Sequence, residues 1–253
     1  MTGMQVVVDG LLTRYELAGK GKLVVLLHGW GDDSRTFIQL HKDLATNYRV
    51  LTLDLPGFGG TQAPLMVWNL DDYATFVASV LQKLELHKVY AVVGHSNGGA
   101  IAIRAISLDL LRPEKLVLLA AAGIRDRGSG KRLALKAVAK TGNATTLWMP
   151  ERYRQSLRKT LYGVAGSDEG AAPQLKETFR KVVRQDVQAD AAKLTLPTLL
   201  IYAADDRAVP LRDGQRYHQL IKNSQLQVVP DAGHFVHHDQ PMTVRRGIEE
   251  FLR

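Results

Sequence analysis

The chain has 253 residues, 45% hydrophobic and 23% charged, a composition typical of a soluble globular protein. It contains no cysteine, which excludes disulfides, zinc–thiolate sites and thiol nucleophiles. The formal net charge is +8. This excess lies in residues 125–197, where fifteen Lys and Arg occur against seven Asp and Glu. Basic character favours anionic partners, but the sequence has no recognisable nucleic-acid-binding motif, so we expect no nucleic-acid partner.

The N-terminal residues, Met1–Leu12, lack a basic stretch leading into a long apolar one, so they do not predict a secretory signal peptide. No apolar run approaches the roughly 18 residues that a membrane-spanning helix needs. We therefore expect a cytoplasmic protein without a membrane span. The length suits one large domain or two small ones, and the sequence leaves the oligomeric state open.

Short apolar runs alternate with amphipathic stretches, which predicts a mostly parallel sheet with helices on both faces. A hairpin opens the chain, with Val6–Val8 and Arg14–Leu17 on either side of the turn signal Asp9-Gly10. The remaining predicted strands are apolar throughout, as expected of strands buried on both faces. They are Leu23–Leu27, Val50–Leu53, Val89–Val93, Leu116–Ala121, Thr198–Tyr202 and Gln225–Val229.

Helical spacing of apolar residues occurs between these runs. The predicted helices are Ser34–Thr46, Asp71–Leu84, Gly98–Leu111, Leu211–Ile221 and Pro241–Leu252. Asp71 and Asp72 give their helix the acidic first turn that the helix dipole favours, and Pro241 suits a first helical position.

Residues 125–195 break this alternation. The segment has no strand-like run but three helical stretches, Lys131–Lys140, Glu151–Leu161 and Gln174–Ala192, separated by glycine-rich stretches. We interpret it as a helical cap inserted into a core formed by residues 1–124 and 196–253.

The central chemical motif is Gly94-His95-Ser96-Asn97-Gly98, which fits G-x-S-x-G between a predicted buried strand and a helix. A sharp strand-to-helix turn presents the serine hydroxyl at the carboxyl end of the sheet, and its flanking glycines avoid collisions with neighbouring backbone. The pentapeptide alone also fits a purely structural turn. In this context it predicts Ser96 as a nucleophile.

A serine nucleophile needs a base, because its hydroxyl is weakly reactive at neutral pH. His234 is the candidate, since it follows the last predicted strand and so lies at the same edge of the sheet as Ser96. His237 and His238 are close by in sequence, but we expect them to face solvent or contact the cap. We assign no chemistry to the other histidines, His28, His41, His87, His95 and His218.

The imidazole in turn needs a carboxylate that fixes its tautomer and stabilises its cation. Asp205 and Asp206 both follow the Thr198–Tyr202 strand and precede His234, which gives the order serine, acid, histidine. The oxyanion of the tetrahedral intermediate needs backbone donors. We expect these to be the N–H groups of Asn97 and of Trp30, although the loop that carries Trp30 could also be a simple strand-ending turn.

These motifs together resemble the α/β-hydrolase superfamily over essentially the whole chain. They are His28-Gly29-Trp30-Gly31, Asp54-x-Pro56-Gly57-x-Gly59, Gly94-His95-Ser96-Asn97-Gly98-Gly99, Asp206-x-x-x-Pro210 and Gly233-His234-Phe235. The resemblance implies an α/β fold with a mostly parallel eight-stranded sheet and a cap inserted between strands 6 and 7. It implies that Asp206 is the acid, because the family's acid precedes a proline by four residues. A serine at position 96 also separates the chain from relatives with an aspartate nucleophile.

The resemblance implies hydrolysis of an acyl bond without a metal or other cofactor, and a carboxylic ester of a small molecule is our first expectation. Thioesters, lactones, perhydrolysis and carbon–carbon bond cleavage remain alternatives on the same fold. A non-enzymatic receptor would be expected to lack a member of the triad, and none is missing. The basic cap could attract an anionic acyl group or could simply expose charge for solubility. Asn97 stands where relatives commonly have a hydrophobic residue, so its amide adds a polar group near the acyl site.

Apolar side chains of the cap could line an acyl pocket or pack the cap helices together. Those of the cap are Leu147, Trp148, Met149, Leu161 and Phe179, and the core adds Phe58 and Phe235 as pocket candidates. We expect Trp30 to form a wall on the oxyanion side.

Overall fold

The computed structural model describes residues 3–125 and 173–253. Contacts divide the chain into two units, Met1–Ile124 with Asp168–Arg253, and Arg125–Ser167; the fold below is that of the first unit. The predicted helices Lys131–Lys140 and Glu151–Leu161 lie outside the described residues. Within residues 3–125 and 173–253, no helix combines the length and the apolar character needed to cross a membrane.

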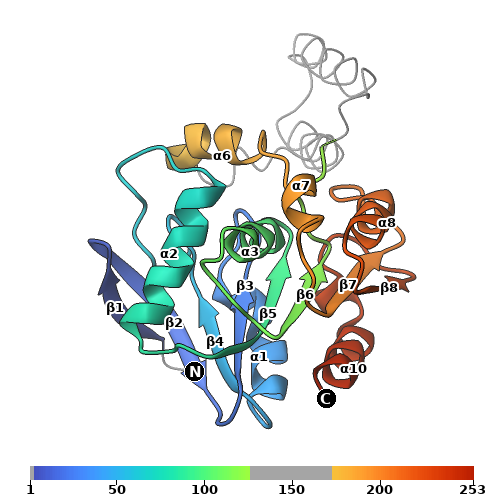
Figure 1. The fold of residues 1–253 in the computed structure, drawn as a ribbon. Helices are drawn as coiled ribbons and strands as arrows, with labels where there is room; N and C mark the ends of the chain where they lie inside the picture. Colours follow the sequence, from blue (N-terminus) through green and yellow to red (C-terminus); the bar gives the residue numbers. More distant parts are fainter. Residues whose placement is uncertain (1–2, 126–172) are drawn as a thin grey trace, which may run out of the picture. The chain divides into compact units, whose positions relative to one another are not determined.

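Eight strands of this unit form one sheet in the order β1-β2-β4-β3-β5-β6-β7-β8 (Figure 1). The β1–β2 and β2–β4 pairs are antiparallel, and all other neighbouring strands are parallel. The fold is the predicted α/β architecture. The strands are β1 (Met4–Val8), β2 (Leu11–Ala18), β3 (Leu23–Leu27), β4 (Arg49–Leu53), β5 (Val89–His95), β6 (Lys115–Leu119), β7 (Thr198–Ala203) and β8 (Ser224–Val229).

The continuous apolar runs of the central strands have a direct cause in the two-sided packing of the sheet. Successive side chains of a strand point to opposite faces. In β3, Leu23, Val25 and Leu27 therefore enter one hydrophobic core, and Val24 and Leu26 enter the other. Every residue of this strand is buried.

The outermost strand, β8, departs from the expected burial. Gln225 and Val228 are exposed, and Val229 is its buried residue. The prediction that Gln225–Val229 is buried on both faces is therefore wrong. The reason is position, because β8 is the edge of the sheet and pairs only with β7.

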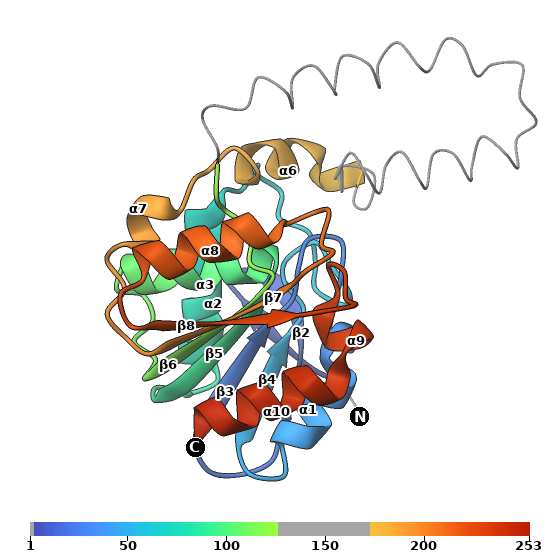
Figure 2. The same ribbon diagram turned by 90° about the vertical axis from the view of Figure 1, so that its right-hand side faces the viewer.

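Helices cover both faces of the sheet, as Figures 1 and 2 show. One face carries α2 (Leu70–Lys83), α3 (Asn97–Ser107), α7 (Gln188–Ala191) and α8 (Leu211–Leu220), and α6 (Lys176–Val182) lies beyond the carboxyl ends of the strands (Figures 1 and 2). These five helices share a core. The opposite face carries α1 (Ile38–Leu44), α9 (Val236–Asp239) and α10 (Pro241–Leu252). The sheet is thus a rigid platform between two apolar layers.

Helix ends follow from local sequence. The α2 helix begins at Leu70 because Asn69 accepts hydrogen bonds from the N–H groups of Asp71 and Asp72, and Asp72 accepts one from the Asn69 N–H in return. Pro241 occupies the first turn of α10, as predicted. The predicted Ser34–Thr46 helix is shorter, because Ser34–Phe37 forms a 3₁₀ turn (η1) before α1.

The insertion between β6 and β7 is described from residue 173 onward. There the predicted helix Gln174–Ala192 is divided into a 3₁₀ turn (η3, Pro173–Leu175), α6 and α7. The Asp186 side chain accepts a hydrogen bond from the N–H of Gln188, the first residue of α7, and the N-cap residue of this helix is Val187. Buried apolar side chains of α6 and α7 belong to the same core as the sheet.

Candidate active site

Ser96 lies in the turn between β5 and α3, in a strained backbone conformation. Its φ of 51° and ψ of −117° are rare for a residue with a side chain. The turn is held by hydrogen bonds on both sides of this residue. The Ser96 N–H donates to the Leu119 carbonyl at 3.0 Å, and the Ser96 carbonyl accepts from the Ala122 N–H at 3.0 Å. The surrounding sheet therefore imposes the strain and fixes where the hydroxyl points.

Two glycines permit this turn because the neighbouring backbone leaves no room for a Cβ atom. A Cβ at Gly98 would lie 2.2 Å from the Leu27 carbonyl oxygen. A Cβ at Gly94 would lie 2.6 Å from the Gly99 Cα atom. The glycine spacing seen in the sequence is thus a steric requirement of the close approach of α3 to the sheet.

A continuous series of hydrogen bonds connects Asp206, His234 and Ser96. The His234 Nε2 atom is 3.0 Å from the Ser96 Oγ atom, and its Nδ1 atom is 2.8 Å from the Asp206 Oδ2 atom. The other carboxylate oxygen, Oδ1, accepts from the N–H groups of Ala208 and Val209 at 2.8 and 2.9 Å. Because an ionised carboxylate only accepts, Nδ1 carries the imidazole proton and Nε2 is free to accept the serine proton.

The two neighbouring aspartates have different environments. Asp206 is buried with its carboxylate directed at His234, whereas Asp205 is exposed. The structure therefore brings Asp206, and not Asp205, into contact with the imidazole. This geometry agrees with the choice that the D-x-x-x-P pattern implied.

One of the two nearby histidines differs from expectation. His237 is buried, so the prediction that it faces solvent is wrong, and its Nε2 atom lies 3.0 Å from the Thr36 Oγ1 atom. Most of the predicted cap lies outside the described residues, so the alternative of a cap contact stays a prediction. Burial, with smaller effects from His238 and His234, lowers the pKa of His237 to about 3. His238 is exposed, and its Nε2–H donates to the Thr36 carbonyl at 2.8 Å. Neither ring has a hydrogen bond with Ser96 among the described residues.

The loop after β3 lies against the nucleophile. A Cβ atom on Gly29 would be 3.1 Å from the Ser96 Cβ atom, a tight contact that favours glycine at this position. Within the described residues, the backbone N–H groups of Trp30 and Asn97 have no hydrogen-bond acceptor. Asn97 is the first residue of α3, where helical N–H groups lack intrahelical partners. Both groups are therefore available to a negatively charged oxygen.

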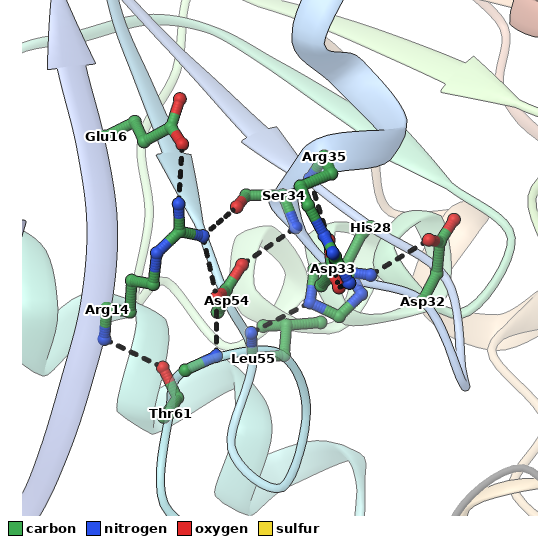
Figure 3. A network of polar contacts seen from close by, with 11 residues as sticks. Arg14, Glu16, His28, Asp32, Asp33, Ser34, Arg35, Asp54, Leu55 and Thr61 are labelled. Carbon is green, nitrogen blue, oxygen red and sulfur yellow. Dashed lines mark hydrogen bonds and ion pairs between the residues drawn. The ribbon is translucent and has the colours of Figure 1, made fainter. Parts of the chain in front are cut away.

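A buried histidine of this loop, His28, contacts the main chain on both sides of its ring, and Figure 3 shows its hydrogen bond with Leu55. The His28 Nδ1 atom lies 2.7 Å from the Gly29 carbonyl oxygen, and its Nε2 atom accepts from the Leu55 N–H at 2.9 Å. A carbonyl can only accept, so the proton is on Nδ1 and the ring is neutral. Burial lowers the pKa of His28, which is consistent with this state.

Asp54 joins the same loop to β2 (Figure 3). One carboxylate oxygen accepts from the Ser34 N–H at 2.7 Å, and the other from the Gly60 N–H at 2.8 Å and the Arg14 guanidinium at 3.1 Å. In the sequence, Asp54 stands out only as part of a motif, and nothing there predicts its contact with Arg14. The signal that could have revealed Asp54 is a lone acid at the end of a buried strand, since a buried carboxylate needs partners.

The predicted pocket residues differ in burial and in whether they belong to the described part of the chain. Phe58 and Phe179 are buried against Trp30, with ring centroids 4.9 and 5.2 Å from its ring. Phe235 is 41% exposed, and its ring centroid is 5.6 Å from that of His234. The remaining candidates, Leu147, Trp148, Met149 and Leu161, lie outside the described residues. Over the described part of the chain, no group of three or more His, Cys, Asp or Glu residues could hold a metal ion.

The chain is similar to known hydrolases along most of its length. A model of the alpha/beta hydrolase family matches residues 24–246. A 2-hydroxy-6-oxo-2,4-heptadienoate hydrolase of Pseudomonas putida is 28% identical over 99% of this chain and 96% of that protein. A pimeloyl-acyl-carrier-protein methyl ester esterase of Chromobacterium violaceum is 29% identical over 94% of this chain and 96% of that protein. A solved meta-cleavage product hydrolase from Pseudomonas fluorescens is 26% identical, with a TM-score of 0.74 over 98% of this chain and 97% of that one.

Proposed function

The chain belongs to the alpha/beta hydrolase family, and we propose that it is a serine hydrolase that cleaves carboxylic esters of small molecules. The observation that carries the proposal is the hydrogen-bonded series Asp206–His234–Ser96, with distances of 2.8 and 3.0 Å. A serine with both an imidazole and a carboxylate in this order is equipped for nucleophilic attack.

In the proposed reaction, the Ser96 Oγ atom attacks the ester carbonyl while His234 Nε2 accepts its proton. Asp206 stabilises the resulting imidazolium. The carbonyl oxygen becomes an oxyanion that the N–H groups of Trp30 and Asn97 bind, and the N-terminus of α3 favours its charge. His234 then donates the proton to the departing alkoxide, which leaves as an alcohol. Water, deprotonated by His234, hydrolyses the acyl-enzyme and restores Ser96.

The choice of an ester is supported by the relative named a methyl ester esterase, which aligns over nearly its whole length. A second candidate is hydrolysis of a carbon–carbon bond next to a carbonyl group. It is favoured by two relatives of equally complete overlap, one named a 2-hydroxy-6-oxo-2,4-heptadienoate hydrolase and one a meta-cleavage product hydrolase. Both reactions would use the same serine and oxyanion donors, so substrate measurements must separate them.

A fluorophosphonate probe tests the nucleophile. We expect the native protein to gain one phosphonyl adduct, which peptide mass spectrometry locates on Ser96, and Ser96→Ala to gain none. Ser107→Ala is the matched control, because that hydroxyl lies in α3 and bonds to Asp190. Labelling that persists in Ser96→Ala, or native protein that does not react, contradicts the proposal.

Substrate class is tested by comparing kcat/KM for p-nitrophenyl esters of increasing acyl length with kcat/KM for a 2-hydroxy-6-oxo-2,4-dienoate. We expect the best ester to exceed the dienoate. The reverse order would replace ester hydrolysis by carbon–carbon bond cleavage while leaving the nucleophile unchanged.

A further inference from the structure

The residue before the nucleophile, His95, connects the Ser96 turn to the loop that carries His234. Its Nε2 atom is 2.9 Å from the main-chain carbonyl oxygen of His234, a contact between segments 139 positions apart in the sequence. We propose that His95 is a positioning residue, which holds the backbone of the proposed base in register with the nucleophile. This inference rests on the proposed function.

The hydrogen bond defines the protonation of His95. A carbonyl oxygen accepts and cannot donate, so Nε2 carries the proton. The other ring nitrogen, Nδ1, is buried and has no partner among the described residues, and a Cβ on Gly29 would lie only 3.1 Å from it. A cationic ring would carry an additional proton on Nδ1, and this N–H group would have no acceptor among the described residues. The neutral Nε2–H tautomer is therefore the form that fits the site.

The surroundings of His95 favour the same neutral form. The side chain is 1% exposed, and its ring centroid is 4.9 Å from that of His234 and 4.8 Å from that of His237. Burial, followed by the charges that His237, His234 and His238 would carry, lowers the pKa of His95 well below its usual value. A neutral neighbour matters for catalysis, because a second positive charge beside His234 would oppose formation of its imidazolium.

Over residues 3–125 and 173–253, the other main-chain hydrogen bonds of the His234 loop do not connect it to the turn that carries Ser96. The Ala232 carbonyl accepts from the Asp205 N–H at 3.2 Å, which connects the loop to the end of β7. The Gly233 N–H donates to Asp239 at 2.8 Å, within the same segment. Among the described residues, the bond from His95 is the one that joins the main chain of residues 230–235 to the nucleophile turn.

The position of the His234 backbone determines where its Nε2 atom lies. The backbone of His234 is separated from its Nε2 atom by two side-chain rotations, so a displaced backbone shifts the proton acceptor relative to the Ser96 Oγ atom. Misplacement of a reacting group by about 1 Å can cost about a hundredfold in rate. Loss of the His95 bond should therefore reduce kcat and leave KM nearly unchanged.

Two amide replacements separate this role from simple packing. In His95→Gln the side-chain amide nitrogen can occupy the place of Nε2 and still donate to the His234 carbonyl. In His95→Asn the amide nitrogen falls near the place of Nδ1 and cannot reach it. Both variants are uncharged and polar and both remove the ring, so they differ mainly in the position of the donor.

We expect His95→Gln to retain kcat within about threefold and His95→Asn to lose about tenfold to a hundredfold, with KM changed by less than about threefold in both. Equal kcat values for the two variants, or a loss confined to KM, would overturn the inference. Thermal unfolding of each variant is measured in parallel. If His95→Asn does not fold, His95→Gln alone decides, because a loss of tenfold or more in that variant also refutes the role.

A second measurement does not depend on catalysis. Nitrogen-15 NMR of histidine-labelled native protein at neutral pH should show His95 as the neutral tautomer with its proton on Nε2, assigned by the loss of this signal in His95→Gln. A proton on Nδ1, or on both nitrogens, contradicts the bond on which the inference depends. Failure of the native protein to react with the fluorophosphonate would instead remove the proposed function, and the NMR result would still report the bond.

Discussion

Replacement of Asp206 by asparagine should invert the proton arrangement of His234 without changing the shape of the site. The Asp206 Oδ1 atom accepts from two backbone N–H groups, those of Ala208 and Val209. If the amide nitrogen took the place of Oδ1, its N–H group would face two other N–H donors and no acceptor. The carbonyl oxygen of the asparagine side chain must therefore occupy that place. The amide nitrogen then points at His234 Nδ1, 2.8 Å away in the native geometry.

The consequence is a catalytic base of the wrong tautomer. His234 Nδ1 must accept from the amide, so its proton moves to Nε2, the atom that faces the Ser96 hydroxyl. An Nε2–H group cannot accept the serine proton. A comparable change in a serine protease triad lowers kcat by about 10⁴-fold. That factor corresponds to about 5 kcal/mol in activation free energy.

The assay is kcat for the best p-nitrophenyl ester at neutral pH, with thermal unfolding to show that each variant is folded. Asp205→Asn is the matched control, because the Asp205 carboxylate is exposed and does not bond to His234. We expect Asp206→Asn to lose about four orders of magnitude in kcat and Asp205→Asn to keep native activity. A loss of less than tenfold in Asp206→Asn, or equal losses in both variants, would refute the reasoning.

Three further outcomes follow from the fold. Gly98→Ala places a Cβ atom 2.2 Å from a main-chain oxygen, whereas the nearest atom to a Cβ in Gly233→Ala lies at 3.5 Å. We therefore expect a large decrease in melting temperature for Gly98→Ala and a small one for Gly233→Ala. Similar melting temperatures would contradict the steric argument. His237 has a pKa of about 3 when folded and about 6.5 when unfolded, so the unfolded chain binds the extra proton between these values. Its contribution to stability is complete above pH 6.5 and decreases by up to about 1.4 kcal/mol per pH unit as the pH falls towards 3. We expect the free energy of unfolding, measured by urea titration at several pH values between about 6.5 and 4, to depend less steeply on pH in His237→Gln, by about this amount. An unchanged dependence on pH would contradict burial of the neutral ring. Asp54→Asn removes the buried carboxylate that Arg14 contacts and leaves Glu16 as the carboxylate in contact with this guanidinium, so it should lower the free energy of unfolding by about 3 kcal/mol. Arg35→Gln, which removes an exposed guanidinium from Asp33, should change the free energy of unfolding little, and equal effects of the two variants would contradict this difference.

The sequence was sufficient to predict the sheet because strand burial leaves a direct mark. The β3 and β5 strands lie in the middle of the sheet and consist of apolar runs, so the two predicted starts, Leu23 and Val89, agree with the structure. The same reasoning failed for β8, where apolar and polar residues alternate. Exposure there is set by which strand lies at the edge, and that order is a property of the assembled sheet.

The contacts of the candidate site were predictable where they follow from chain order at one edge of the sheet. Ser96, Asp206 and His234 each follow a strand, and the structure brings them together. Burial of His237 and the bond from His95 to the His234 carbonyl were not predicted. Both depend on how separate loops pack across the sheet edge, and a histidine has the same sequence signature whether it is exposed or buried.

The edge position of β8 makes the proposed base depend on a single strand pairing. The strands that precede the Trp30 loop and the Ser96 turn, β3 and β5, each have a neighbouring strand on both sides. In the described sheet β8 has a neighbour on one side, β7, and His234 follows β8 directly. Loss of this one pairing would therefore separate the base from the proposed nucleophile while the rest of the sheet stays paired.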